Sequence, residues 1–341
     1  MTGIVKDRRF LDHNYGAGHV EGPERLEAIY GMIEGGLPFP LASVEPRPAL
    51  RHEIEYVHSP DYVNLIERTA GRRHVMLDAD TSLTAKSYET ALIAAGATMN
   101  AADAVLDGRI DNGFAFVRPP GHHAERDRGM GFCVFNNIAI AAEHLVRRFG
   151  LERVLIADWD LHHGNGTEHA FYDRSDVLFF STHQFPYYPG TGYWDEVGAG
   201  AGEGFTVNVP LAPGKGDGDY LFIFRNILGP IAAAFRPEFI LVSAGFDIYA
   251  ADPLGGMNVT PDGFDGLASE LLEMAQRLCH GRLLFVLEGG YDFTGLAEGS
   301  RRVLTRISGS AGPSLVKAEI STAARKEISP VFDVQKRYWP L

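Results

Sequence analysis

Four short apolar runs, each followed at once by polar or glycine residues, constrain the fold of this chain more than any other feature. They span residues 113–117, 153–157, 239–244 and 283–287 and consist mainly of Val, Leu, Ile, Phe and Ala. Runs of this length are typical of parallel strands that helices bury on both faces. Open α/β sheets bind their ligands at the carboxyl ends of the strands, so the residues after these runs are the candidates for chemistry.

The segment Asp158-Trp-Asp-Leu-His-His-Gly-Asn-Gly166 follows the second run. In an extended chain alternate side chains share a face, so we expect Asp158, Asp160 and His162 to point the same way. Carboxylates and an imidazole are ligands for Zn²⁺ or a similar divalent cation. A buried charge network that orients a loop is the alternative, although buried charges are costly unless they are paired or bound to a metal.

A third ligand is expected from the run at 239–244, which continues to Asp247. Parallel strands bring such distant residues to one edge of a sheet. A catalytic zinc site takes three protein ligands and leaves one position open, and Asp160, His162 and Asp247 would fill that role. Taken alone, an Asp after a strand is more often a turn or helix cap.

The other two strand ends add imidazoles and a phenol. Arg118-Pro-Pro-Gly-His-His-Ala124 follows the first run, and its prolines stiffen a turn that presents His122 and His123 side by side. After the last run, two glycines allow a tight turn before Tyr291. A phenol in this place can donate a hydrogen bond to an oxyanion. A tyrosine packed in the core, with its hydroxyl satisfied, is the competing interpretation.

Several of these segments together carry a resemblance to a known family. The chain resembles the histone deacetylases and acetylpolyamine amidohydrolases, in particular the class II-like bacterial histone deacetylase-like amidohydrolases, over roughly residues 3–310. This resemblance implies the arginase-deacetylase fold, an α/β domain whose eight-stranded, mostly parallel sheet has helices on both faces. We expect one catalytic domain over residues 1–311 and a C-terminal extension over 312–341. The matching segments are Arg118-Pro-Pro-Gly-His-His-Ala-Glu125, Gly131-Phe-Cys-Val-Phe-Asn-Asn137, Asp158-Trp-Asp-Leu-His-His-Gly-Asn-Gly166, Pro189-Gly-Thr-Gly192, Ser243-Ala-Gly-Phe-Asp247, Asp252-Pro-Leu-Gly-Gly256 and Leu287-Glu-Gly-Gly-Tyr291.

The resemblance also implies the reaction, which is metal-dependent hydrolysis of the N-acetyl amide of acetyl-lysine or a small acetylated amine. His123 would be the general base and acid, and Tyr291 would polarise the acyl carbonyl. His122, hydrogen-bonded to Asp158, would be a cationic electrostatic partner. Asn165 stands where class I enzymes place an aspartate behind the second histidine, so His123 is expected to be less basic than in those enzymes. Zn²⁺ is the expected metal, and Fe²⁺ and Co²⁺ accept the same ligands.

A substrate channel is implied at Gly131 and Phe132, with Tyr188 as the opposite wall, although core packing is the alternative role of these residues. Asp80 aligns loosely with an acid at the channel rim. Leu254, seven positions after Asp247, occupies a place where related polyamine-selective enzymes carry a glutamate. This predicts a preference for acetyl-lysine-like substrates over acetylated polyamines.

Monovalent cation sites are implied as well, with K⁺ as the expected ion. The residues of the first are Asp158, Asp160, His162, Ser181 and Thr182, and those of the second are Phe171, Arg174, Val177 and Phe205.

Net charge and the lack of a long apolar stretch argue against nucleic acid and membranes as partners of this chain. The chain has 31 basic and 44 acidic residues and a net charge of −13, which is unfavourable for nucleic-acid binding. No apolar stretch is long enough to span a bilayer and no signal segment follows Met1, so we expect a cytoplasmic enzyme without a membrane partner. The oligomeric state stays open, a homo-oligomer included.

Two other functions are alternatives to amide hydrolysis. A binuclear manganese ureohydrolase would require further carboxylates where the chain has His163, Gly164 and Asn165. An inactive acyl-group reader is disfavoured by the presence of His123 and Tyr291.

Strands and helices are expected to alternate along the chain. The sequence pattern predicts helices at 23–34, 60–70, 87–106, 136–149, 217–235, 261–278 and 294–307, and strands at 3–6, 113–117, 153–158, 177–182, 205–209, 239–244 and 283–287.

Overall fold

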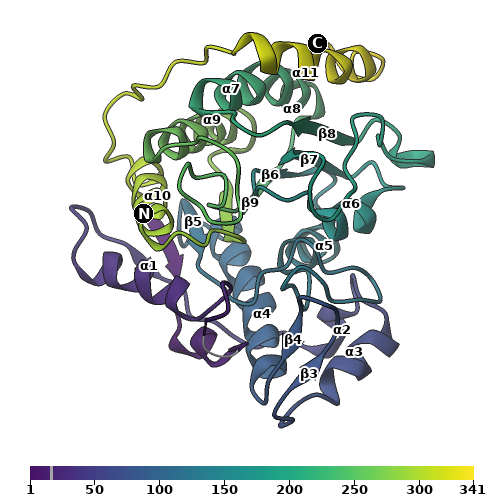
Figure 1. Cartoon of the computed structure of the whole chain (residues 1–341), viewed down its shortest axis with the longest axis vertical. Coiled ribbons are helices and arrows are strands. Elements are labelled where there is room, and N and C mark those ends of the chain that lie inside the picture. Colours follow the sequence, from purple (N-terminus) through teal and green to yellow (C-terminus); the bar gives the residue numbers. More distant parts are fainter. Residues whose placement is uncertain (16–17) are drawn as a thin grey trace.

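The computed structural model describes residues 1–15 and 18–341 of the chain. Its centre is an eight-stranded sheet in the order β2-β1-β5-β10-β9-β6-β7-β8, in which every neighbouring pair is parallel (Figure 1). The predicted α/β fold is thereby confirmed. The strands of this sheet are β1 (Thr2–Val5), β2 (Ala42–Ser43), β5 (Asn112–Ala115), β6 (Val154–Asp158), β7 (Val177–Gln184), β8 (Thr206–Leu211), β9 (Phe239–Ala244) and β10 (Leu283–Leu287).

The register brings the carboxyl ends of the central strands to one level. Asp158 at the end of β6 pairs with Ser243 of β9, and Ala244 of β9 pairs with Leu287 of β10. All residues of these three strands are buried, as expected for strands covered on both faces. The loops that follow them therefore leave the sheet side by side.

Two layers of helices cover the sheet. Helices α4 and α5 pack against each other and contact β5 and β9, whereas α9 and α10 pack together and contact the same two strands (Figure 1). Within the described ranges, no helix is both long and apolar enough to cross a membrane. The helices are α1 (Glu24–Glu34), α2 (Arg51–Ile54), α3 (Pro60–Glu67), α4 (Ser87–Leu106), α5 (Asn137–Phe149), α6 (Asn165–Phe171), α7 (Asp217–Ile223), α8 (Gly229–Phe235), α9 (Pro261–Cys279), α10 (Phe293–Ile307) and α11 (Thr322–Gln335), with short 3₁₀ turns at Arg8–Asp12 and Gly200–Gly202.

The single helix predicted over 217–235 is interrupted. A π-helical segment, Phe224–Leu228, separates α7 from α8. Pro230 follows directly in the first turn of α8 and has no N–H to donate to a carbonyl one turn earlier. A wider turn before the proline is one way for a helix to accommodate that missing bond.

The segment after α10 lies against the edge strand β8 of the same chain (Figure 1). Gln335 Nε2 donates a hydrogen bond to the Thr206 carbonyl (3.2 Å), and Trp339 Nε1 donates to the Gly204 carbonyl (2.7 Å). The sequence left open whether this ending docks on its own domain or on another subunit. In the structure it docks on its own domain. A two-stranded antiparallel hairpin, β3 (Val75–Met76) and β4 (Ser82–Leu83), lies outside the main sheet.

Candidate active site

Asp160, His162 and Asp247 meet at the ends of β6 and β9. One ligand atom from each lies within 4.8 Å of the others. His162 Nδ1 is 3.0 Å from Asp247 Oδ2 and 3.2 Å from Asp160 Oδ1. All three residues are buried. The predicted ligand set therefore converges in space.

The surroundings of these donors fit a divalent metal ion. Gly289 N donates to Asp160 Oδ2 (2.8 Å) and Leu161 N donates to Asp247 Oδ1 (2.9 Å), so backbone groups orient both carboxylates. A Cβ at Gly289 would lie 2.3 Å from Asp247 Oδ2, which leaves room only for glycine. Burial, together with the nearby Asp160 charge, raises the pKa of Asp247 to about 7. A cation between the carboxylates would relieve that cost, and two carboxylates with one imidazole suit Zn²⁺.

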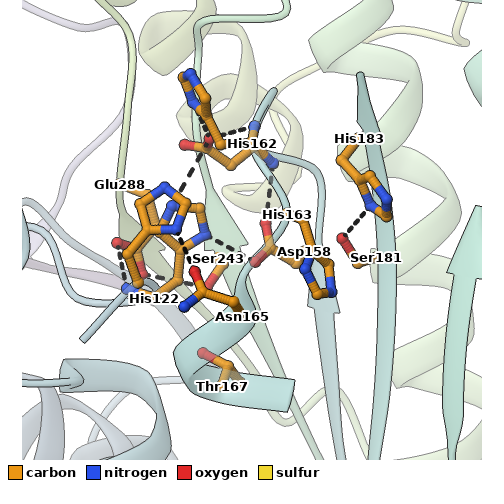
Figure 2. Close-up of polar contacts among 12 residues, drawn as sticks. His122, Asp158, His162, His163, Asn165, Thr167, Ser181, His183, Ser243 and Glu288 are labelled. Atoms are coloured by element: carbon orange, nitrogen blue, oxygen red, sulfur yellow. Dashed lines mark hydrogen bonds and ion pairs between the residues drawn. The ribbon is translucent and has the colours of Figure 1, made fainter. Parts of the chain in front are cut away.

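His122 is paired with Asp158 through a hydrogen bond from Nδ1 to Oδ2 (2.9 Å; Figure 2). Burial alone would lower the pKa of His122, but the charges of Asp160, Asp158 and Glu288 raise it to about 10. These carboxylates favour the cationic form of His122, whose role as an electrostatic partner stays a prediction.

His123 differs from its neighbour in partner and in charge. Its Nδ1 lies 2.8 Å from Asn165 Oδ1, at the start of α6, where Asn165 is drawn in Figure 2. Burial, and the positive charges of His122 and His162, hold the pKa of His123 well below its ordinary value. The lowered pKa favours the neutral form of His123, which leaves one ring nitrogen unprotonated.

Tyr291 is held by contacts to its ring and its backbone. The Arg25 guanidinium lies 4.9 Å from the ring centroid, and Tyr291 N donates to Asp252 Oδ2 (2.6 Å). Burial raises the pKa of the Tyr291 phenol well above its ordinary value. The hydroxyl therefore stays protonated and available as a hydrogen-bond donor.

His122, His123, His162 and Tyr291 line one cavity of about 90 Å³. Phe132 in its wall has φ 67°, a left-handed conformation that non-glycine residues rarely adopt, and Phe132 N donates to Thr81 Oγ1 (2.9 Å). The Tyr188 ring stands edge-on to His123 with centroids 5.2 Å apart. The lining residues are Asp80, Pro120, His122, His123, Gly131, Phe132, His162, Tyr188, Leu254, Gly289 and Tyr291. The loosely aligned Asp80 therefore does lie at the cavity, where its Oδ1 accepts from Gly131 N (3.1 Å).

Comparison with known proteins identifies this arrangement. Residues 19–307 match the histone deacetylase domain. The chain belongs to the histone deacetylase family. Members hydrolyse acetylated amides, and this chain is accordingly a hydrolase of that kind.

Individual relatives span several kingdoms. This chain is 41% identical to a probable deacetylase of Archaeoglobus fulgidus, and the match covers 86% of this chain and 82% of the relative. It is 39% identical to the polyamine deacetylase HDAC10 of Mus musculus, and histone deacetylase 15 of Arabidopsis thaliana is 37% identical. The match covers 50% of the mouse protein and 63% of the plant protein. A crystal structure of the HDA15 HD domain superposes with a TM-score of 0.92 at 38% identity, covering 99% of this chain and 95% of that one.

Several of the residues expected around K⁺ lie near one another in the structure. Ser181 pairs with Asp158 across β7 and β6, and Thr182 Oγ1 donates to the Asp158 carbonyl (3.4 Å). In the second set, the Phe171 carbonyl accepts a hydrogen bond from Arg174 N (3.0 Å), and the Phe205 carbonyl accepts one from Phe179 N (2.9 Å). Val177 is the first residue of β7, the strand that contains Phe179. Both sets stay predictions as cation sites.

Sequence reasoning missed Glu288, which holds the tandem histidines to β10. Its Oε2 accepts from Gly121 N (2.7 Å) and His122 N (3.2 Å), and its Oε1 accepts from Ser243 Oγ (3.1 Å). Burial raises the pKa of Glu288 to about 7. The signal was present, because Glu288 follows a buried apolar run just as the expected ligands do.

Arg25 and its partner Glu21 were missed as well. Arg25 donates to the Gly290 carbonyl (2.6 Å) and the Glu288 carbonyl (2.5 Å), and Glu21 forms ion pairs with Arg25 (3.0 Å) and Arg118 (2.6 Å). Arg25 lies on α1, far from the strand ends in sequence. Its position in an amphipathic helix gave no signal of a buried ionic role.

Proposed function

We propose that this chain is a zinc-dependent deacetylase that hydrolyses the N-acetyl amide of acetyl-lysine or a similar acetylated amine. The observation that carries the proposal is the convergence of Asp160, His162 and Asp247 at the cavity that His123 and Tyr291 line. A neutral imidazole, a protonated phenol and three buried metal-ligand candidates are the groups that amide hydrolysis requires.

Asp160, His162 and Asp247 would hold the metal. A divalent ion at this place would supply Lewis acidity for the acyl carbonyl and the attacking water. Fe²⁺ and Co²⁺ remain alternatives to Zn²⁺, since each accepts oxygen and nitrogen ligands. We propose a structural role for K⁺ at the two sets of residues around β7.

The side chains divide the chemistry among them. His123 takes the proton of the attacking water and later gives it to the leaving amine. Tyr291 donates a hydrogen bond to the oxyanion as the carbonyl becomes tetrahedral. His122, an imidazolium beside Asp158, stabilises the developing negative charge without transferring its proton.

The channel favours an aliphatic stem. Phe132 and Tyr188 offer aromatic walls. Gly131 lines the same cavity and must be a glycine, because a Cβ there would lie 2.3 Å from the His123 ring. Leu254 at the same cavity offers apolar contact only. We therefore propose a preference for acetyl-lysine-like substrates.

Acetylpolyamine hydrolysis is the second candidate, because two relatives are named as polyamine deacetylases. A non-catalytic acyl-group binding protein is less favoured, given the complete set of candidate catalytic groups. Neither nucleic acid nor a membrane is proposed as a partner, and cytoplasmic location and homo-oligomerisation stay predictions for fractionation and light scattering.

The test is a substrate panel. Metal-free protein is reconstituted with Zn²⁺, Fe²⁺ or Co²⁺ and assayed against acetyl-lysine peptides, acetylated polyamines and small acetylated amines. We expect turnover of acetyl-lysine substrates and its loss on chelation. No turnover of any acetylated amine by metal-loaded protein would contradict the proposal.

A further inference from the structure

The carboxylate of Glu125 lies behind the tandem histidines, on a surface hollow of about 230 Å³ that is separate from the catalytic cavity. It contacts two side chains of α6. Asn165 Nδ2 donates to Glu125 Oε1 (2.5 Å), and His169 Nδ1 lies 2.9 and 3.0 Å from the two carboxylate oxygens. Asn165 and His169 are four residues apart and share one helix face. One carboxylate therefore holds a full turn of α6.

The backbone of Glu125 is fixed independently of these contacts. Glu125 N donates to the Arg128 carbonyl (2.9 Å), and the Glu125 carbonyl lies 2.8 Å from His58 Nδ1. The side chain is 18% exposed. Glu125 is thus a stationary group against which the Asn165 amide must orient.

The neighbours of Asn165 decide which way its amide points. A carboxylate accepts hydrogen bonds and donates none, so the amide atom that faces Glu125 must be the NH₂ group. Met130 Sδ, a weak acceptor, lies 3.6 Å from the same nitrogen. With the NH₂ group committed to acceptors, Oδ1 is left to face His123 Nδ1 at 2.8 Å. The assignment follows from hydrogen-bond chemistry and not from shape, because the two ends of an amide are nearly the same size.

The amide orientation in turn decides where His123 carries its proton. A carbonyl oxygen only accepts, so neutral His123 must hold its proton on Nδ1 and keep the lone pair on Nε2. A rotated amide would present NH₂ to Nδ1 and move the ring proton to Nε2. A ring protonated at Nε2 could not take a proton from water with that nitrogen.

We propose that Glu125 is a positioning residue that selects the productive tautomer of His123 by fixing the Asn165 amide. This inference rests on the proposed function, in which His123 is the general base. It also explains why an amide stands at position 165. An aspartate there would place a second carboxylate within hydrogen-bond distance of Glu125.

Steady-state kinetics of the metal-loaded full chain give the first test. Glu125→Ala is expected to lower kcat ~10- to 100-fold, part of the ~10²- to 10⁴-fold that a general base contributes, with KM little changed. Glu125→Gln can present either an acceptor or an NH₂ donor to Asn165, so it removes the selection but keeps the packing, and its kcat should lie between those of the parent and Glu125→Ala. Asp173→Asn removes a charge from the same surface hollow without touching Asn165 and should leave kcat unchanged.

A double-mutant cycle separates positioning from mere support of the fold. In Asn165→Asp, either carboxylate oxygen can accept from His123 Nδ1, so Glu125 is no longer needed to orient the group and instead repels it. Glu125→Ala should therefore lower kcat in the parent but raise it in the Asn165→Asp background. Equal losses in both backgrounds would assign Glu125 a structural role and overturn the proposal.

Nitrogen NMR of histidine-labelled protein reports the tautomer directly. In the metal-loaded parent, His123 should show a protonated Nδ1 and an unprotonated Nε2, with the signals assigned by their loss in His123→Gln. Glu125→Ala should show a substantial Nε2-protonated population at equal metal content. An unchanged tautomer in folded Glu125→Ala overturns this inference and leaves the deacetylase proposal intact. A shifted tautomer in a protein that hydrolyses no acetylated amine would instead overturn the proposed function alone.

Discussion

The Arg25 guanidinium lies 4.9 Å from the centroid of the Tyr291 ring while donating hydrogen bonds to the carbonyls of Glu288 and Gly290, the residues just before that tyrosine. A single cation from α1 therefore fixes both the ring and the loop of the proposed oxyanion donor. Its charge is balanced by Glu21, which is itself fully buried.

Arg25→Lys should lower kcat because a point charge cannot replace the planar fork that reaches two carbonyls and stacks on the ring. Small misplacements of a catalytic group cost up to ~10²-fold in rate, and we expect a loss of roughly 10- to 100-fold. Arg225→Lys, at an exposed ion pair with Glu270, is the matched control. Parent-like kcat in Arg25→Lys would show that the ring is positioned by other contacts.

Tyr291→Phe should lower kcat ~10²- to 10³-fold, the usual cost of removing one oxyanion donor, with fold and metal content retained. Tyr220→Phe is the control, since the buried Tyr220 hydroxyl has no hydrogen-bond partner within the described part of the chain. Kinetics, circular dichroism and elemental analysis check the pair. An unaffected kcat would make Tyr291 a packing residue.

His162→Ala and Asp247→Ala should each abolish activity through loss of the metal, because a three-ligand site has no spare member. Elemental analysis after dialysis measures the metal directly. Asp61→Ala removes an exposed carboxylate and should keep the parent metal content. Full metal occupancy in either ligand variant would refute the assigned ligand set.

Leu254→Glu should shift selectivity toward acetylspermidine by several-fold. A carboxylate at the cavity can attract the second, cationic amine of that substrate, and an exposed ion pair is worth about 1 kcal/mol. The measurement is kcat/KM for an acetyl-lysine peptide and for N8-acetylspermidine in both proteins. Leu315→Glu, at a residue that is 87% exposed, controls for added charge. A parent enzyme that already prefers the polyamine would contradict the role given to Leu254.

Stability should fall as pH drops through the range set by His58. Burial lowers the pKa of His58 from 6.5 to about 4. Its Nε2 accepts from Asn136 N (2.9 Å) at the start of α5, and protonation removes that acceptor. Because the folded pKa is the lower one, this stabilisation is complete above pH 6.5 and is lost as pH falls toward 4, by about 3 kcal/mol at that point.

Urea unfolding at several pH values checks the His58 prediction. His58→Gln should flatten the slope between pH 6.5 and pH 4. His52→Gln, at an exposed histidine in α2, should keep the parent slope. Equal slopes in all three proteins would rule out His58 as the source.

The pattern of buried runs and strand-end polar residues was sufficient to predict seven of the eight strands and to bring the candidate ligands together, whereas the count of eight came from the family resemblance. The pattern worked because Asp160, His162 and Asp247 follow strands whose ends the register aligns. Glu21 and Arg25 lie on or beside α1, and nothing in their local sequence encodes the contacts of Arg25 with the carbonyls of Glu288 and Gly290.

Short elements were missed for a different reason. β2 has two residues and α2 four, so neither shows a period that could be recognised. Helix α6 begins at Asn165, inside the segment interpreted as a metal-binding loop. The role of Glu125 depends on which face of α6 lies against it, and the sequence alone does not give that face.

The two outer strands of the sheet differ in how they avoid pairing with another molecule. β2 has only two residues, which are too few to form stable backbone hydrogen bonds with a strand of another molecule. β8 is longer, but side chains of the 312–341 segment occupy polar groups at and beside it, including the Thr206 carbonyl and the Ala212 N–H, which donates to Glu327 (3.0 Å). The extension therefore covers an edge that would otherwise be open to pairing with another chain, so we expect its removal to lower solubility.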